Sequence, residues 1–323
     1  MKSFGNDEQR IRETGSMHAV RSSPGSLCRI KRPWPVQNVL AVLIKLLSRI
    51  ITVVYDTVFP PHCLACGDFY HPSADDSKET RREPDNRETG ATRSIREQVD
   101  RHLSAYVCPV CIRGIAVVES PLCSYCGVPF QSREGEDRVC GGCLTSPKRF
   151  RIARAPLVYD QTVVTVIQRF KFRGKIQLAR PLSEILLTTF KCFWDVDSID
   201  VIIPVPLHVK RLRERGFNQS YLLIQNWNDS ASHDRSQPFN LQNDGDILFK
   251  KAFTEAQTGL GRKQRLLNVK NAFGIRNDRK IKNKGILLVD DVYTTGATVD
   301  ECARLLLDHG ASHVDVLTLA RAM

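Results

Sequence analysis

The sequence predicts a parallel α/β domain over residues 150–323, preceded by a small metal-binding module. Two observations predict this architecture. In the second half of the chain, short β-branched segments alternate with amphipathic helical segments, which is typical of a parallel sheet with helices on both faces. In the first half, four Cys-x-x-Cys pairs account for eight of the 11 cysteines. That spacing indicates metal ligation rather than a disulfide framework.

Composition limits the class of protein. The 323 residues are 42% hydrophobic and 25% charged, which is typical of a soluble globular protein. The formal net charge of +12 favours an anionic partner, either nucleic acid or a phosphorylated metabolite. The cysteine usage and the absence of a secretory signal predict a reducing compartment, the cytoplasm.

The first 59 residues divide into two predicted segments. Residues 1–35 are polar and are predicted to be a disordered extension. Residues 36–59 are predicted to form an amphipathic helix, because the polar positions Asn38, Lys45, Arg49, Thr52 and Asp56 fall on one stripe. Charges near its centre argue against a transmembrane segment. We expect the helix to pack on the protein or a partner, with peripheral membrane contact as the alternative.

Residues 60–149 are predicted to form a double zinc ribbon, with a polar insertion loop at 70–101 whose end carries a short helix marked by Ile95, Val99 and Leu103. Eight thiolates suit two Zn²⁺ ions, and closed S₄ sites leave no open position, so the zinc is expected to be structural. Sequential pairing is the simplest arrangement, and interleaved pairing stays open. The ligands are Cys63, Cys66, Cys108, Cys111, Cys123, Cys126, Cys140 and Cys143.

In the α/β domain we expect strands at 152–159, 201–205, 248–253, 286–289 and 313–319. Helices are expected at 162–171, 176–193, 218–227, 262–271 and 299–309, and a polar loop at 228–247. The basic residues show no aromatic interleaving that would stack on bases, because Phe217, Trp227, Phe253 and Phe273 sit at core positions.

A candidate ligand site follows the strand at 286–289. Asp290 and Asp291 come first, and the loop then runs into a helix through Thr294, Thr295, Gly296, Ala297 and Thr298. Free N–H groups, hydroxyls and the positive end of a helix make a cradle for phosphate. Two adjacent carboxylates repel each other, which makes a chance strand–turn–helix a poor explanation, and they suit ribose hydroxyls or Mg²⁺. The segment therefore predicts a site for a ribose 5-phosphate group, such as that of phosphoribosyl pyrophosphate.

Residues 286–298 resemble the phosphoribosyl pyrophosphate signature of type I phosphoribosyltransferases. Together with the cysteine pairs and the run Arg-Glu-Arg-Gly-Phe-Asn-Gln at 213–219, the chain resembles the ComF family of bacterial competence proteins from about Leu46 onward. The resemblance implies a type I phosphoribosyltransferase fold. It also implies that Asp290 and Asp291 hold the ribose hydroxyls and Mg²⁺, and that residues 294–298 hold the 5-phosphate.

The resemblance further implies a pyrophosphate turn and a flexible loop. The turn begins at Val205 and Pro206, although Pro204-Val205-Pro206 departs from the small glycine-containing turn of most phosphoribosyltransferases. Basic residues follow the turn, and the flexible loop supplies further candidates: Lys210, Arg211, Arg213 and Arg215 beyond the turn, and Gln257, Arg262 and Arg265 in the loop.

Two functions from different classes stay open. The first is a phosphoribosyltransferase that releases pyrophosphate to an unidentified acceptor. The second is a non-enzymatic adaptor that senses nucleotides or binds single-stranded DNA, a competence helicase or DNA-processing proteins. The family resemblance implies a role in DNA uptake or in the use of incoming DNA under either function.

Overall fold

The computed structural model describes residues 41–47, 51, 61–70, 89–132, 134–172, 174–227, 242–251 and 270–323. It divides the chain into two compact units, Met1–Val54 and Tyr55–Met323. The predicted extension 1–35 lies outside the described residues, and so do Gln257, Arg262 and Arg265 of the predicted flexible loop. Within the predicted helix 36–59, residues 41–47 and 51 are helical and exposed. Among the described residues, no helix has the length and apolar character needed to cross a bilayer.

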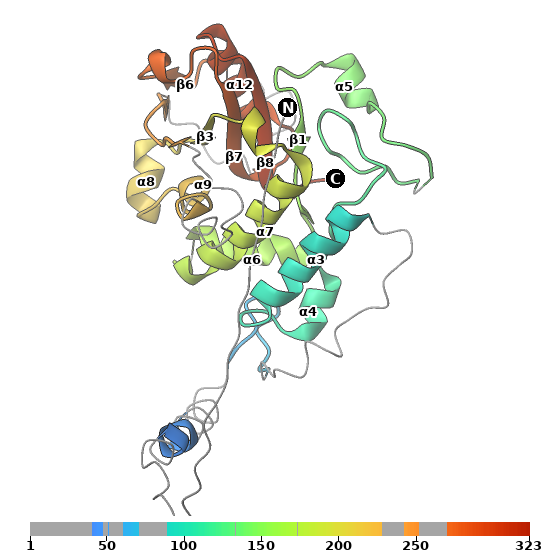
Figure 1. Cartoon of the computed structure of the whole chain (residues 1–323), viewed down its shortest axis with the longest axis vertical. Coiled ribbons are helices and arrows are strands. Elements are labelled where there is room, and N and C mark those ends of the chain that lie inside the picture. Colours follow the sequence, from blue (N-terminus) through green and yellow to red (C-terminus); the bar gives the residue numbers. More distant parts are fainter. Residues whose placement is uncertain are drawn as a thin grey trace, which may run out of the picture. The chain divides into compact units, whose positions relative to one another are not determined.

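The second unit contains a parallel sheet (Figure 1), with strand order β1-β8-β7-β3-β4 and β2 also paired to β8. The strands are β1 (Ala153–Arg154), β2 (Leu157–Val158), β3 (Val201–Pro204), β4 (Gln242–Asn243), β7 (Gly285–Tyr293) and β8 (His313–Arg321). A separate antiparallel pair joins β5 (Leu248–Lys250) to β6 (Phe273–Ile275).

The predicted helices cover both faces of this sheet. They are α6 (Gln161–Phe172), α7 (Ala179–Phe193), α9 (Gln219–Leu222) and α12 (Ala297–Asp308), with short 3₁₀ turns η1 (Ile176–Leu178), η2 (Val196–Ser198) and η3 (Asp278–Lys280). The helix α8 (Val209–Arg215) was not predicted, and residues 262–269 of the predicted helix 262–271 lie outside the described residues. Strand residues alternate between two cores, as the two-residue period of a strand requires. In β7, Leu287 and Val289 share a core with α6 and α7, whereas Ile286 and Leu288 share one with α12.

Most predicted elements have slightly different bounds in the structure, and three differ most. The predicted strand 152–159 is interrupted at Pro156 and becomes β1 and β2, because proline cannot donate to a sheet ladder. The predicted helix 218–227 is regular only over α9 and continues as turns. The strand predicted to end at Val289 continues as β7 to Tyr293, so the acid pair lies inside the strand.

The short helix predicted at the end of the insertion 70–101 is present as α3 (Gly90–Leu103), and it begins earlier than Ile95, the first residue that marked it. Thr89 begins this helix by accepting a hydrogen bond from the backbone N–H of Thr92 at 3.2 Å. Ile95, Val99 and Leu103 are buried, as their spacing predicted, and α3 packs along α7 (Figure 1). Residues 71–88 lie outside the described part of the chain.

Candidate metal centres and phosphate site

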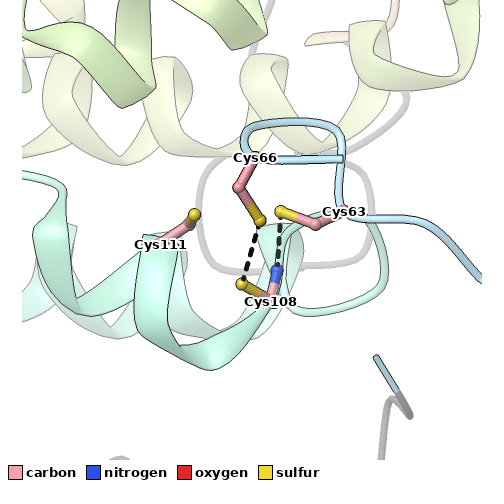
Figure 2. Close-up of side chains that lie close together, drawn as sticks. All are labelled: Cys63, Cys66, Cys108 and Cys111. Atoms are coloured by element: carbon pink, nitrogen blue, oxygen red, sulfur yellow. Dashed lines mark hydrogen bonds between the residues drawn. The ribbon is translucent and has the colours of Figure 1, made fainter. Parts of the chain in front are cut away.

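The cysteines form two groups, and their pairing is the sequential one. Cys63, Cys66, Cys108 and Cys111 make the first group, here called zinc site 1 (Figure 2), with Sγ atoms within 4.8 Å of one another. Cys123, Cys126, Cys140 and Cys143 make the second, here called zinc site 2, within the same limit. Each site takes its second pair from the start of a short helix, α4 (Pro109–Gly114) or α5 (Gly141–Thr145).

The sulfur spacing fits tetrahedral zinc. Zn–S bonds of about 2.3 Å place the sulfurs of an S₄ site about 3.8 Å apart. The Sγ atoms of Cys66 and Cys108 are 3.9 Å apart, and those of Cys126 and Cys140 are 3.7 Å apart. No acidic or histidine ligand is included in either group, so both have the closed donor set of a structural site.

The two sites repeat the same local geometry. In site 1, the Sγ of Cys63 accepts the backbone N–H of Cys108 at 3.3 Å (Figure 2), and in site 2 the Sγ of Cys123 accepts that of Cys140 at 3.4 Å. Burial opposes thiolate formation, but such N–H donors outweigh it and lower the pKa of Cys63 to about 6 and that of Cys123 to about 7. This N–H pattern stabilises thiolates, the form that binds zinc.

The acid pair lies where β7 reaches the edge of the sheet. The Oδ1 of Asp290 accepts the hydroxyl of Ser220 at 3.1 Å and the N–H of Asp291 at 2.9 Å. Asp291 forms an ion pair with Lys171, at 2.7 Å between Nζ and Oδ1. Burial, together with the charge of Asp291, raises the pKa of Asp290 to about 7. The charged form of Asp290 is therefore disfavoured, and a bound cation or a hydroxyl donor would stabilise it.

The predicted pyrophosphate turn is the neighbour of the acid pair. Pro204 lies opposite Val289 in the ladder between β3 and β7, so Val205 and Pro206 leave the sheet beside Asp290. The basic helix α8 follows, with Lys210, Arg211, Arg213 and Arg215 along it. The structure thus brings the turn, the basic residues and the acid pair to one edge, which is where α/β sheets bind ligands.

The run at 213–219 connects these parts. Gly216 ends α8 in the left-handed region at φ 81°. The side-chain amide of Asn218 donates to the carbonyl of Val205 at 3.2 Å, and its oxygen caps α9 at Ser220. Gln219 donates to the carbonyl of Lys171 and accepts from Arg215. The motif therefore ties the turn, the acid pair and the end of α6 together.

The predicted phosphate loop lies between β7 and α12. Gly296 caps α12 at φ 75°, and a Cβ there would lie 2.1 Å from the hydroxyl oxygen of Tyr293. Only glycine fits both requirements. The first-turn N–H groups of an α-helix have no backbone partner inside the helix and can face an anion. In α12 the N–H of Ala297 donates to the hydroxyl of Thr295 at 3.4 Å, so an anion would share or replace that contact. Thr294 is exposed, Thr295 and Thr298 are half-buried, and Ala297 is buried.

Several residues at this site were not predicted from the sequence as site residues. Lys171 and Ser220 contact the acid pair directly. Lys250 lies near Asp290 and Arg211, and its burial lowers its pKa. Phe172 is 65% exposed, with the Arg215 guanidinium 4.4 Å from its ring centroid. Phe172 is thus an exposed aromatic residue beside a basic one, contrary to the expectation of no aromatic interleaving, whereas Trp227 and Phe273 are buried as expected.

Comparison with known proteins agrees with this geometry. Residues 246–323 match the family of phosphoribosyl transferase domains. DNA utilization protein YhgH of Escherichia coli O157:H7 is 33% identical over 220 residues, which cover 67% of this chain and 91% of that protein. Competence protein F of Haemophilus influenzae is 32% identical over 206 residues, or 62% of this chain and 85% of that protein. Competence protein ComFC of Bacillus subtilis is 30% identical over 223 residues, or 67% and 84%.

Among solved structures, the hypoxanthine phosphoribosyl transferase of Trypanosoma cruzi aligns with 47% of this chain and 66% of that one, at 12% identity and a TM-score of 0.27. That likeness is too weak to carry an argument. The matched domain, the parallel sheet and the paired Cys₄ groups define a type I phosphoribosyltransferase fold joined to zinc ribbons. The chain belongs to the ComF family of competence and DNA utilization proteins.

Proposed function

We propose that this protein binds phosphoribosyl pyrophosphate with Mg²⁺ at the edge of the sheet formed by β3 and β7. The observation that carries the proposal is the acid pair at the carboxyl end of the central strand β7, where Asp290 accepts from Ser220 and Asp291 pairs with Lys171. The pKa of Asp290, raised to about 7 by burial, supports a functional role for this pair.

Each part of the ligand has a matching group in the chain. The N–H groups and hydroxyls at 294–298 suit the 5-phosphate, and Asp290 and Asp291 suit the ribose hydroxyls and Mg²⁺. Lys210, Arg211, Arg213 and Arg215 lie beyond the turn at Val205 and Pro206, where the pyrophosphate would extend. Bound Mg²⁺ would neutralise charge that develops on departing pyrophosphate. Gln257, Arg262 and Arg265 are proposed to close over the ligand.

Titration calorimetry with phosphoribosyl pyrophosphate and Mg²⁺ tests the proposal. Wild type should bind, and Asp290→Ala/Asp291→Ala should not, because the variant lacks both carboxylates. The matched control is Asp308→Asn, an exposed carboxylate on α12 that pairs with Arg304. It should bind as wild type does. Absence of binding to wild type would refute the proposal.

The relatives are named for competence and DNA utilization, so we propose that this protein acts in the uptake or use of incoming DNA, in the cytoplasm. Measuring pyrophosphate release distinguishes the two possible modes of action. A phosphoribosyltransferase would release pyrophosphate when an acceptor such as a nucleobase, an amine or a nucleic acid is added. An adaptor would bind the ligand without releasing pyrophosphate.

Phe172 favours the adaptor mode as a second candidate function. An exposed ring with a guanidinium on one face leaves the other face for a base of single-stranded DNA. Phe172→Ala should weaken binding of a short single strand about tenfold, since stacking contributes about 1–3 kcal/mol per base. Phe130→Ala is the matched control, because Phe130 also carries an arginine, Arg138, at 4.0 Å but belongs to the zinc ribbon. Equal losses in both variants would exclude Phe172 as a stacking platform.

A further inference from the structure

Arg321 is a buried cation with an unusual set of partners. It lies at the end of β8 with 8% of its surface exposed. Its Nη2 donates to the Sγ of Cys126 at 3.4 Å, and its Nη1 donates to the carbonyl of Thr294 at 3.0 Å. Among the described residues it forms no ion pair with a carboxylate, and its Nε has no hydrogen-bond partner. One guanidinium therefore joins zinc site 2 to the first residue of the phosphate loop.

The thiolate of Cys126 supplies the charge that a buried guanidinium needs. Burying an unpaired cation is costly, so a buried arginine requires an anion or several acceptors. Cysteine bound to zinc is a thiolate, and four thiolates around Zn²⁺ leave a net negative charge beside Arg321. Loss of the metal would release the cysteine pair that holds Cys126 in place, and the guanidinium would lose the fixed position of its Sγ acceptor.

The Nη1 group of Arg321 contacts the phosphate loop directly. The carbonyl of Thr294 and the N–H of Thr295 belong to one planar peptide unit. A donor that fixes the Thr294 oxygen therefore also fixes the direction of the Thr295 N–H, which is one of the groups proposed to face the 5-phosphate. A longer bond of 3.5 Å from Nη1 to the carbonyl of Tyr293 holds the preceding peptide.

Packing adds a second connection between the same two places. The Arg321 guanidinium lies 3.9 Å from the ring centroid of Tyr293. Phe150, just beyond the zinc ribbon, meets the same ring edge-on at 6.1 Å. Gly296 rests so close to Tyr293 that a Cβ would collide with it. A displacement at zinc site 2 would therefore be transmitted to the loop through rigid groups.

We infer that Arg321 is a positioning residue that couples zinc occupancy of site 2 to the affinity of the phosphate loop for its ligand. The inference rests on the proposed function, since it concerns binding at that loop. Coupling between two binding sites is reciprocal, so the ligand must tighten zinc binding at site 2 by the same factor. Zinc site 1 has no such connection among the described residues, and its affinity for zinc should not respond to the ligand.

The test measures zinc transfer to a zinc-selective chelator, with and without phosphoribosyl pyrophosphate and Mg²⁺. Alkylation of the freed cysteines, followed by peptide mass spectrometry, assigns the released zinc to a site. In wild type the ligand should make zinc at site 2 about tenfold harder to remove, within the usual range of allosteric coupling. Site 1 should release zinc at an unchanged chelator concentration.

Arg321→Met should abolish this protection and weaken ligand binding about tenfold, the same coupling factor. The matched control is Arg154→Met. Arg154 donates to the carbonyls of Ser124 and Ala153 beside site 2 but has no hydrogen bond to the phosphate loop. This variant should loosen zinc at site 2 and leave ligand affinity unchanged with zinc in excess. Arg321→Lys keeps the positive charge but lacks the two Nη donors of the guanidinium. Compared with Arg321→Met, it should recover part of the zinc retention but little of the ligand affinity.

Three results would overturn the inference. Arg321→Met could bind the ligand as wild type does, or the ligand could protect both zinc sites equally, and either would refute the coupling alone. If wild type bound no phosphoribosyl pyrophosphate, the proposed function would be refuted, and the coupling, which depends on it, would be refuted as well. Should Arg321→Met fail to fold, as judged by thermal unfolding, the same comparison with Arg321→Lys decides the question.

Discussion

The two zinc sites have the same ligands and the same internal geometry, but they stand in different surroundings. Cysteines of site 1 share a core with α3, α6 and α7, and Cys66 is exposed. Cysteines of site 2 share a core with α12 and Tyr293, and the corresponding Cys126 is buried against Arg321. The role of a structural metal therefore depends on what its ligands contact. Among the described residues, the cysteines of site 2 are joined to the candidate ligand site through Arg321, and those of site 1 are not.

The largest expected effect comes from removing one site at a time. Cys108→Ala/Cys111→Ala and Cys140→Ala/Cys143→Ala should each reduce the zinc content by one ion per chain. Each should destabilise its ribbon by an amount on the order of 10 kcal/mol, the free energy that structural zinc contributes. Elemental analysis and thermal unfolding measure these effects.

The two variants should differ in ligand binding. The first is expected to keep binding phosphoribosyl pyrophosphate while its ribbon is unfolded, because no hydrogen bond among the described residues joins its cysteines to residues 294–298. The second is expected to lose most of its affinity. If the first variant lost affinity as fully as the second, the distinction between the two sites would be broken.

A smaller effect should separate two equivalent glycines. Gly67 and Gly127 follow the first cysteine pair of their sites and have positive φ values of 89° and 65°. A Cβ on Gly67 meets nothing within 4 Å, whereas one on Gly127 would lie 2.5 Å from the carbonyl oxygen of Ala153 in β1. Gly67→Ala should cost about 1 kcal/mol for its left-handed backbone. Gly127→Ala should cost about 3 kcal/mol, because overpacking is added.

Denaturant titration of both glycine variants, with zinc in excess, checks this difference. The result also tests how closely zinc site 2 packs against the sheet, because Gly127 lies against β1 and Gly67 contacts no strand. Equal costs at the two positions would mean that the contact between site 2 and β1 is looser than the structure has it.

The smallest effect concerns Asp290, which contacts neither zinc site. Its pKa is raised to about 7 in the folded protein, above the ordinary value of 3.8. Stability from the protonated form is therefore complete below about pH 4 and is lost as pH rises through 7. Without ligand, Asp290→Asn should be more stable than wild type by about 2 kcal/mol at pH 8, allowing for partial exposure, and equally stable at pH 4.

Thermal unfolding at the two pH values measures this difference, and zinc content should stay unchanged in the variant. Asp291→Asn is the matched control. It removes the partner of Lys171, so it should not give the same gain at pH 8. A gain that did not depend on pH would show that the charge of Asp290 is not its cause.

The features that the sequence predicted well are periodic or local. Cysteine spacing predicted both S₄ groups, and the alternation of short apolar strands with amphipathic helices predicted a parallel sheet. The spacing of Ile95, Val99 and Leu103 predicted the end of α3, but its start was missed although Thr89 is a standard N-cap, because the first turn before Ile95 contains no apolar side chain larger than alanine. The roles proposed for residues 290–298, for the pyrophosphate turn and for the flexible loop stay predictions.

The contacts that the sequence could not predict join residues from separate elements. Lys171 ends a helix, Ser220 begins another, and both reach the acid pair only because α6 and α9 meet at the same sheet edge. Arg321 reads as an ordinary residue at the end of a strand. Its contact with Cys126 depends on how the ribbon docks onto the sheet, which no local pattern encodes.

The position of β8 has a consequence for the order in which the molecule is built. This strand lies between β1 and β7, so β1 has no partner strand in the sheet until residues 313–321 have been synthesised. At about 5–20 residues per second, ribosomal synthesis leaves β1 waiting for roughly 10–30 s. The cysteine knuckles close over shorter spans and can capture metal during that interval. A metal-bound ribbon would then keep β1 in position. When β8 pairs with β1 and β7, it would complete the sheet and at the same time bring Arg321 into contact with Cys126.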